Sequence, residues 1–188
     1  MPDPSQTQGP FETLALPARF DLPAGEIERA YLARVAALHP DLASSDPESV
    51  TRAARASAAL NNARSVLTDA ERRANALLAL LGGPTKGEDR SLPDGFLLEI
   101  LEVREKVEAA RDSGDPELID RWNAWSDLER ARYTRLASEL FSALCDPPQP
   151  ERLIEIRTQL NAWRYIERLI EQLDPEYDPA RADFADGA

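Results

Sequence analysis

The stretch that decides the fold is residues 24–67, which read AGEIERAYLARVAALHPDLASSDPESVTRAARASAALNNARSVL. Its first part carries apolar side chains at helical spacing, at Ile27, Tyr31, Val35 and Leu38. This spacing predicts an amphipathic helix over residues 24–38. Pro40 cannot continue that helix, because it lacks an N–H group and restricts the residue before it. Residues 39–47 are therefore predicted to form a loop.

A second helix is predicted from Pro47 to about Leu67, which makes the stretch a helical hairpin. Proline suits the first turn of a helix, and Asp46 before it is a suitable N-cap. One side of this helix carries small and apolar residues, namely Ala53, Ala56, Leu60, Ala63 and Leu67. Small side chains allow a neighbouring helix to pack closely against this side.

Outside the hairpin, the N-terminal half predicts two further helices. One covers residues 11–16 and is expected to end at Pro17, and the other covers residues 71–81 and is expected to end at Gly82-Gly83-Pro84. Residues 1–10 are expected to be disordered. Residues 82–94 combine glycine, proline and charges without periodicity, which predicts a linker.

Three long helical patterns follow the linker, each with a proline near its first turn: residues 93–113, 116–144 and 150–173. The short connections between them predict antiparallel neighbours and therefore a three-helix bundle over residues 95–173. Residues 174–188 are expected to be a disordered tail. The predicted fold class is thus all-α, with an N-terminal helical domain over residues 11–81 and a C-terminal bundle.

Composition narrows the possible functions. The chain of 188 residues has a formal net charge of −12, and residues 91–188 hold 22 acidic against 12 basic groups. Such a chain is a poor ligand for polyanions, so neither nucleic acid nor an anionic membrane is expected as a partner. We find no signal peptide and no apolar run near the roughly 20 residues of a membrane helix, so a cytoplasmic protein is expected.

Cys145 is the only cysteine, so no disulfide and no cysteine-based zinc site can form within the chain. This composition fits a reducing compartment. We expect Cys145 to be a buried and unreactive thiol. We also expect the three tryptophans to belong to the core of the bundle: Trp122, Trp125 and Trp163.

The loop of the hairpin holds the tripeptide His39-Pro40-Asp41. Taken alone, it also fits an ordinary turn that ends a helix. The proline stiffens the loop and lowers the entropic cost of docking, Asp41 offers a carboxylate to a partner arginine, and His39 can donate or accept a hydrogen bond. This is the chemistry of binding. An enzyme that uses His39 with Asp41 is an alternative, but no nucleophile accompanies the lone histidine, so no catalysis is expected.

In its order of elements, this half of the chain resembles the J-domain of DnaJ-type co-chaperones. The resemblance implies that the loop and the helix before it dock on a DnaK-type chaperone and promote ATP hydrolysis there. It assigns chaperone binding to His39, Pro40, Asp41, Arg29 and Arg34. Leu42 stands where J-domains often have a basic residue, and the helix carries only two arginines. We therefore expect docking that is electrostatically weaker or tuned to one particular chaperone.

The resemblance extends over residues 11–173 and narrows to HscB-type co-chaperones of iron–sulfur cluster assembly. In the first half it rests on Ser57-Ala58, Asn61, Ala63, Leu67, Arg73-Ala74, Leu77-Leu78 and Leu81-Gly82. In the second half it rests on Phe96-Leu97-Leu98-Glu99, Glu102-Val103-Arg104-Glu105 and residues 164–169. Asp69-Ala70 departs from the family, which often has a proline there. The resemblance implies an L-shaped arrangement of the two domains.

The first helix of the bundle carries more leucine than its core face needs. At about 100° per residue, one face gathers Phe96, Ile100, Val103 and Val107. Leu97, Leu98 and Leu101 fall on the other side, around Glu105. In the last helix, Tyr165 lies nearly opposite an apolar set made of Ile156, Leu160, Trp163, Ile166 and Ile170. An apolar patch with an acidic rim is typical of a protein-binding site.

In HscB-type proteins this surface receives the cluster-scaffold protein IscU. The resemblance therefore assigns scaffold binding to Leu97, Leu98, Leu101, Glu102, Glu105 and Tyr165. An alternative is that these leucines, Leu97 above all, pack against the N-terminal domain or the linker. No metal or cofactor is expected, because the acidic residues of this helix lack histidine or cysteine support and fit a solvated rim.

The expected function is therefore that of a non-catalytic adaptor, which stimulates a DnaK- or HscA-type ATPase chaperone and delivers an IscU-like scaffold to it. Two alternatives stay open. One is a J-domain co-chaperone that serves a different client. The other is a structural helical protein in which the tripeptide is accidental.

Overall fold

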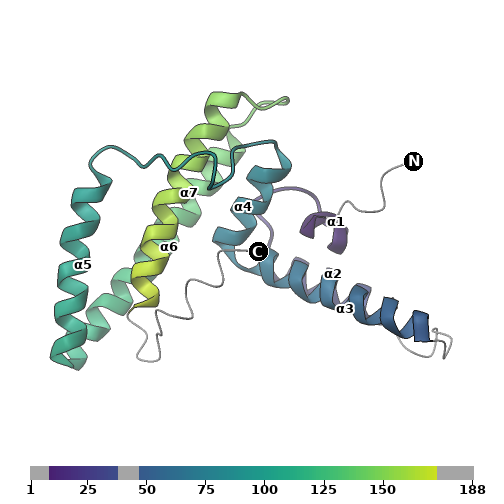
Figure 1. Cartoon of the computed structure of the whole chain (residues 1–188), viewed down its shortest axis with the longest axis horizontal. Helices are drawn as coiled ribbons and strands as arrows, with labels where there is room; N and C mark the ends of the chain where they lie inside the picture. Colours follow the sequence, from purple (N-terminus) through teal and green to yellow (C-terminus); the bar gives the residue numbers. More distant parts are fainter. Residues whose placement is uncertain (1–8, 38–46, 173–188) are drawn as a thin grey trace.

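The structure, a computed structural model, describes residues 9–37 and 47–172, and all seven helices in these two ranges are drawn in Figure 1. They are α1 (Pro10–Leu14), α2 (Ala24–Ala37), α3 (Pro47–Thr68), α4 (Ala70–Leu80), α5 (Phe96–Ser113), α6 (Pro116–Ser142) and α7 (Pro150–Glu171). These ranges contain no strand, and the predicted all-α class is confirmed. The tripeptide, Asp46 and both predicted disordered ends, apart from residues 9 and 10, lie outside the described residues.

The predicted hairpin is present as α2 and α3. Hydrogen bonds between side chains of the two helices stabilise their packing. The Tyr31 hydroxyl donates to Asn61 Oδ1 at 2.8 Å, and Arg64 Nε donates to Glu28 at 2.7 Å. The Arg64 guanidinium also lies 4.9 Å from the centre of the Tyr31 ring. The core side of α3 is the predicted one, because Leu60, Ala63 and Leu67 are all buried, while Ala53 and Ala56 are half-buried.

The apolar stripe predicted for α2 is buried only near its start. Ile27 is 1% exposed, whereas Val35 on the same predicted stripe is 38% exposed. The reason is that α1 covers only one end of the hairpin, where it contributes Phe11 and Leu14 to the core. Figure 1 shows α1 against that end, with the far ends of α2 and α3 extending beyond it.

Three predicted helix boundaries are misplaced, two of them for local backbone reasons. The first helix ends at Leu14 and not at Leu16, because Ala15 takes a left-handed conformation with φ of 52°. The first helix of the bundle begins at Phe96 and not at Pro93, because Gly95 has φ of 78°, which no helical residue adopts. The start of α4 lies one residue earlier than predicted, with the Asp69 side chain accepting a hydrogen bond from Arg72 N at 2.9 Å.

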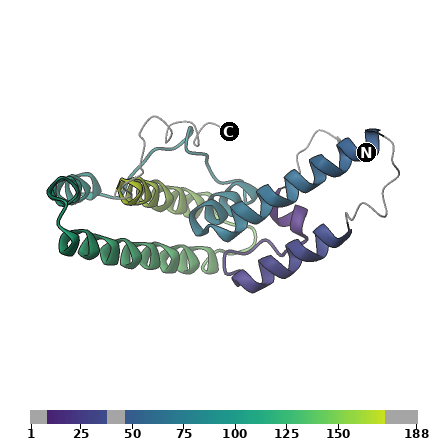
Figure 2. The ribbon, with the colours of Figure 1, turned by 90° about the horizontal axis from the view of Figure 1, so that it is seen from below.

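The three C-terminal helices form the predicted bundle, with α6 and α7 at its centre. Trp163 is buried and stacks on Tyr133 with ring centres 5.8 Å apart. Trp122 and Trp125 are only half-buried and pack against a small second cluster around Val107 and Leu169, so the core prediction holds fully for Trp163 alone. Viewed from below, α6 and α7 run side by side with α5 at their far end (Figure 2).

The prediction for Cys145 is wrong, because this side chain is exposed. It lies just after the end of α6, in the connection to α7, where no further helix covers it. The apolar residues before it, Phe141 and Leu144, pack against the core, but Cys145 itself does not.

A single apolar cluster joins the N-terminal helices to the bundle. Phe20, in the connection between α1 and α2, is 3% exposed and stacks on Phe141 of α6 at 5.7 Å. Arg73 of α4 lies 5.0 Å from the Phe20 ring centre and donates hydrogen bonds to the carbonyls of Phe20 and Leu67. The Ser138 hydroxyl adds a hydrogen bond to Asp21 at 2.8 Å. Packing, and not the linker alone, therefore sets how the hairpin and the bundle meet.

This junction predicts an unequal response to two truncations. Phe20→Ala should lower the free energy of unfolding by about 3–5 kcal/mol, because a buried aromatic side chain is lost from both parts of the core. Leu128→Ala is the control, since Leu128 is 69% exposed on α6, and it should change stability by no more than about 0.5 kcal/mol. Urea unfolding followed by circular dichroism measures both values. Equal effects of the two substitutions would contradict this account of the junction.

Candidate protein-binding site

The predicted chaperone-binding region is described only in part. Its tripeptide lies outside the described residues, while Arg29 and Arg34 are exposed on α2. Because they are five residues apart on a helix with 3.6 residues per turn, their side chains point about 140° apart. The two arginines therefore do not share one narrow face of α2, and Arg34 is the one within a turn of the end of the helix. Their role in binding stays a prediction.

The predicted scaffold-binding leucines lie at the surface of α5. Leu97 is 52% exposed, Leu98 73% and Leu101 54%. The opposite side of α5 holds the buried Phe96 and Val107, as the spacing predicted. Each of the three leucines, Leu97 included, is therefore more than half exposed and is not enclosed by the N-terminal helices or the linker, which was the alternative.

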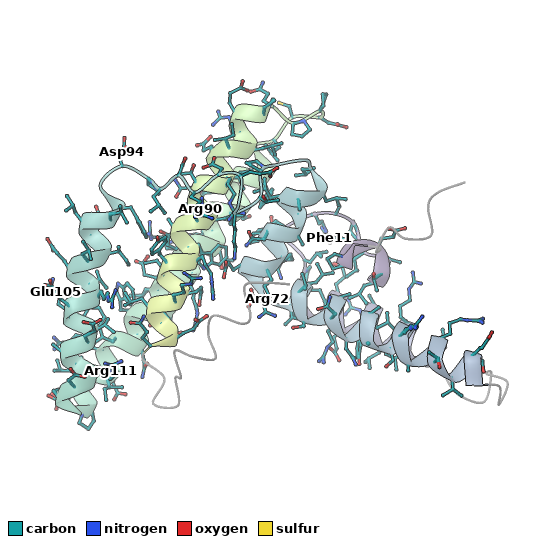
Figure 3. All side chains as sticks on the ribbon, in the orientation of Figure 1. Phe11, Arg72, Arg90, Asp94, Glu105 and Arg111 are labelled. Atoms are coloured by element: carbon teal, nitrogen blue, oxygen red, sulfur yellow. The ribbon has the colours of Figure 1, made fainter. Side chains whose placement is uncertain are left out.

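Acidic side chains border these leucines. Glu102 and Glu105 are both exposed on α5. Figure 3 labels Glu105 and shows its side chain pointing away from α6 and α7. The outer side of α5 is thus apolar with an acidic rim, and no other described helix covers it. Full burial of one leucine is worth about 1.5–3 kcal/mol, so a partner that covers all three gains a large driving force.

Tyr165 connects this surface to α7. It is 45% exposed, and its ring meets the Phe96 ring edge to face with centres 6.0 Å apart. Phe96 is the first residue of α5 and directly precedes Leu97. Tyr165 therefore lies against the first residue of α5, at the end of the helix where the exposed leucines begin. We call Leu97, Leu98, Leu101, Glu102, Glu105 and Tyr165 the α5–α7 surface.

A buried polar joint, which the spacing arguments missed, lies between α4 and α7. Arg157 is 2% exposed and donates from Nη1 to Asn75 Oδ1 at 2.8 Å, while its Nε and Nη2 have no hydrogen-bond partner among the described residues. Glu71 is 8% exposed, and Arg164 Nη1 lies 3.6 Å from its carboxylate. These residues repeat at helical spacing in two predicted helices, which is the only sequence signal that points to them.

Burial dominates the electrostatics of this joint. Desolvation raises the pKa of Glu71 above its ordinary value, against the opposing attraction of Arg164. Desolvation likewise lowers the pKa of Arg157, against the attraction of Glu71 and Asp89. Both groups are therefore less favourably charged here than in water.

Two absences concern the described residues. Within them, no group of three or more histidine, cysteine, aspartate or glutamate side chains is placed to hold a metal ion. Of the helices in residues 9–37 and 47–172, none is both long and apolar enough to cross a membrane.

Comparison with known proteins identifies the family. The family model described as the HSCB C-terminal oligomerisation domain matches residues 92–174. The co-chaperone protein HscB homolog of Mannheimia succiniciproducens is 30% identical over 179 residues, which cover 93% of this chain and 98% of that protein. The homolog of Vibrio cholerae is 35% identical over 109 residues, which cover 57% of this chain and 64% of that protein.

Among solved structures, the crystal structure of human co-chaperone protein HscB matches with a TM-score of 0.73 and 20% identity, over 92% of this chain and 82% of that one. This match shows a shared fold. The sequence relatives place the protein among the co-chaperones. More narrowly, the chain belongs to the HscB family.

The polar joint predicts a pH-dependent effect of Glu71→Gln. Below the ordinary pKa of 4.5, Glu71 is protonated in the folded and unfolded states alike, and its burial carries no charge penalty. As the pH rises through the raised pKa, the folded state comes to bear a desolvated carboxylate, so the wild type loses stability relative to Glu71→Gln. Urea unfolding between pH 4 and pH 7 should show the difference growing in favour of Glu71→Gln. A difference that is constant or reversed would contradict the desolvation account.

Proposed function

We propose that this protein stimulates the ATPase of a DnaK- or HscA-type chaperone through His39-Pro40-Asp41 and presents an IscU-like scaffold protein to it, in support of iron–sulfur cluster assembly. Membership of the HscB family supports the co-chaperone role. The observation that carries the second part is the α5–α7 surface, where α5 exposes three leucines and two acids and Tyr165 of α7 contacts Phe96 at the start of α5.

The chemistry of the α5–α7 surface favours a folded protein as its ligand. Leucines at the centre supply apolar contact, and a partly exposed tyrosine supplies a ring edge with a hydroxyl, which are common anchors of interfaces. Glu102 and Glu105 at the rim favour a partner with basic groups around an apolar patch. A surface of this kind binds and orients its partner and carries out no covalent step, so we propose a non-catalytic role.

The described elements that flank the two proposed sites lie far apart in the molecule. Figure 1 places α5 at one end of the longest axis and the free ends of α2 and α3 at the other, and Figure 2 places them at opposite ends as well. This separation supports simultaneous binding of a chaperone and a scaffold, because neither partner needs the surface of the other. The cytoplasmic location predicted from the sequence stays a proposal.

The chaperone half of the proposal is tested by His39→Gln. This variant should fold like the wild type and reduce the stimulation of the chaperone ATPase to the unstimulated rate, because the loop loses the imidazole that docks on the chaperone. A steady-state ATPase assay with purified DnaK- or HscA-type chaperone measures the effect, and circular dichroism checks the fold. Full stimulation by the folded variant would remove the tripeptide from the proposal.

The scaffold half is tested by alanine at Leu98, Leu101 and Tyr165 together. Loss of three anchors should weaken binding of the IscU-like scaffold by at least about tenfold, or roughly 1.4 kcal/mol. Stimulation of the chaperone without scaffold should stay at the wild-type level. Isothermal titration calorimetry gives the affinity, and Leu128→Ala, another exposed leucine, is the matched control. Unchanged affinity of the triple variant would favour a different client or a different surface.

A further inference from the structure

The segment predicted to be a linker has a defined conformation close to α7. Its first turn is closed by Glu88, whose carboxylate accepts hydrogen bonds from Thr85 N at 2.8 Å and Thr85 Oγ1 at 2.9 Å. A second turn follows, in which Asp89 Oδ1 accepts from Ser91 N at 2.7 Å. These hydrogen bonds lower the pKa of both carboxyl groups, that of Glu88 chiefly through the Thr85 N–H and that of Asp89 through Ser91. The segment therefore reaches α7 as an ordered turn and not as a loose tether.

Asn161 of α7 holds this turn with one amide group. Its Nδ2 donates to the carbonyl of Asp89 at 3.1 Å and to the carbonyl of Ser91 at 3.0 Å. A side-chain NH₂ has two donors, and here both point to carbonyls of the same turn. Figure 3 labels Arg90, the residue between the two carbonyls, and shows it beside α7. We call this pair of hydrogen bonds the Asn161 clasp.

The Asn161 clasp lies one helical turn from the α5–α7 surface. Asn161 and Tyr165 are four residues apart on α7, so they share a face and are separated by about 6 Å along the helix axis. Tyr165 contacts Phe96, and Phe96 follows Ser91 by five residues. The chain is therefore fixed at Ser91 by Asn161 and again at Phe96 by Tyr165, just before the exposed leucines begin.

Half-buried Ile100 packs against both apolar clusters, and Leu92 before the helix packs against the larger one, so α5 is also held from the bundle side. Its buried residues are Phe96 at the start and Val107 and Ala110 in the last two turns. Leu97 and Leu98 face solvent and contribute little to holding the helix in place. The path by which the linker enters α5 therefore acts together with this packing on where these two leucines point.

We propose that Asn161 is a positioning residue for partner binding, which fixes the linker on α7 and so aligns Leu97 and Leu98 with Tyr165. This inference rests on the proposed function of the α5–α7 surface. Asn161 itself lies under the linker and need not touch the partner. The clasp fixes one surface turn and no part of the core, so it acts on alignment more than on global stability.

The test uses the full-length chain with Asn161→Ala and Asn161→Asp. The first variant removes the donors, and the second turns an acceptor toward two carbonyls. Thr158→Ala is the matched control, because Thr158 is half-buried on the same face of α7 and its hydroxyl donates to Ile154 O within the helix. Asn161→Gln keeps the amide donors and should behave more like the wild type than Asn161→Ala does.

Two measurements distinguish whether Asn161 holds the linker from whether it positions the leucines for binding. Limited trypsin digestion with mass spectrometry follows cleavage after Arg90, which is exposed, and calorimetry follows affinity for the IscU-like scaffold. Both Asn161→Ala and Asn161→Asp should be cut after Arg90 about tenfold faster and bind scaffold about tenfold more weakly, as expected for the loss of two hydrogen bonds. Thr158→Ala should match the wild type in both, and stimulation of the chaperone without scaffold should be unchanged in every variant.

Each result decides a different part of the inference. Unchanged cleavage after Arg90 in Asn161→Ala would show that the clasp does not hold the linker, which overturns the inference. Faster cleavage with unchanged scaffold affinity would overturn the positioning role. If the wild type itself bound no scaffold, the proposed function would fail, while the cleavage rates would still report whether the clasp holds the linker.

Discussion

The structure depends on the burial of α4 from two sides at once. Ala74, Leu77 and Leu78 are each at most 3% exposed, and they belong to one apolar cluster with residues of α1, α3, α6 and α7. Arg73 on the same helix donates to two carbonyls of the N-terminal half, while Asn75 accepts from Arg157 of α7. Removing either set of partners would expose apolar surface on α4. The hairpin and the bundle are therefore held together by a shared core.

The polar joint beside this core is costly in electrostatic terms. The buried Arg157 has two nitrogens that lack partners among the described residues, and burial raises the pKa of Glu71. Such groups gain less from pairing than they lose in hydration. The surrounding apolar contacts must offset this cost. In return, the joint ties α4 to α7 at two levels, through Asn75 with Arg157 and through Glu71 with Arg164. A slip of one helix along the other would break both links between α4 and α7, while Arg164 would keep its ion pair with Glu171 on the same helix.

The sequence predicts the periodic features of this molecule well and the irregular ones poorly. The helices, the buried stripe of α3 and the two faces of α5 follow from spacing, because each helix has a regular repeat. The starts of α5 and α4 and the end of α1 were misplaced, since the conformation of a single residue such as Gly95 or Ala15 decides them. Exposure of Val35 and Cys145 depends on which other helix covers them, and that information is not local.

The candidate site also has a part that spacing predicts and a part that it does not. Leu97, Leu98 and Leu101 could be assigned to an outer face from spacing alone, and Tyr165 could be placed opposite the core of α7. Their proximity across two helices could not be predicted from spacing, because it depends on the Tyr165–Phe96 contact and on the path of the linker. Single polar residues such as Asn161 leave no periodic signal, so only the three-dimensional structure reveals what they hold.

The charge distribution gives the separation of the two proposed sites a physical consequence. Residues 91–188 hold 22 acidic and 12 basic groups, whereas residues 1–90 hold 12 and 10. The acidic half repels any acidic surface of a chaperone, while Arg29 and Arg34 lie exposed on α2 of the hairpin. Under the proposed function, electrostatic steering would favour approach of the chaperone to the hairpin and of a basic client to α5. Because a shared core joins the hairpin to the bundle, the orientation of a client at α5 relative to the hairpin would be set by the packing of α4 and not by a flexible tether.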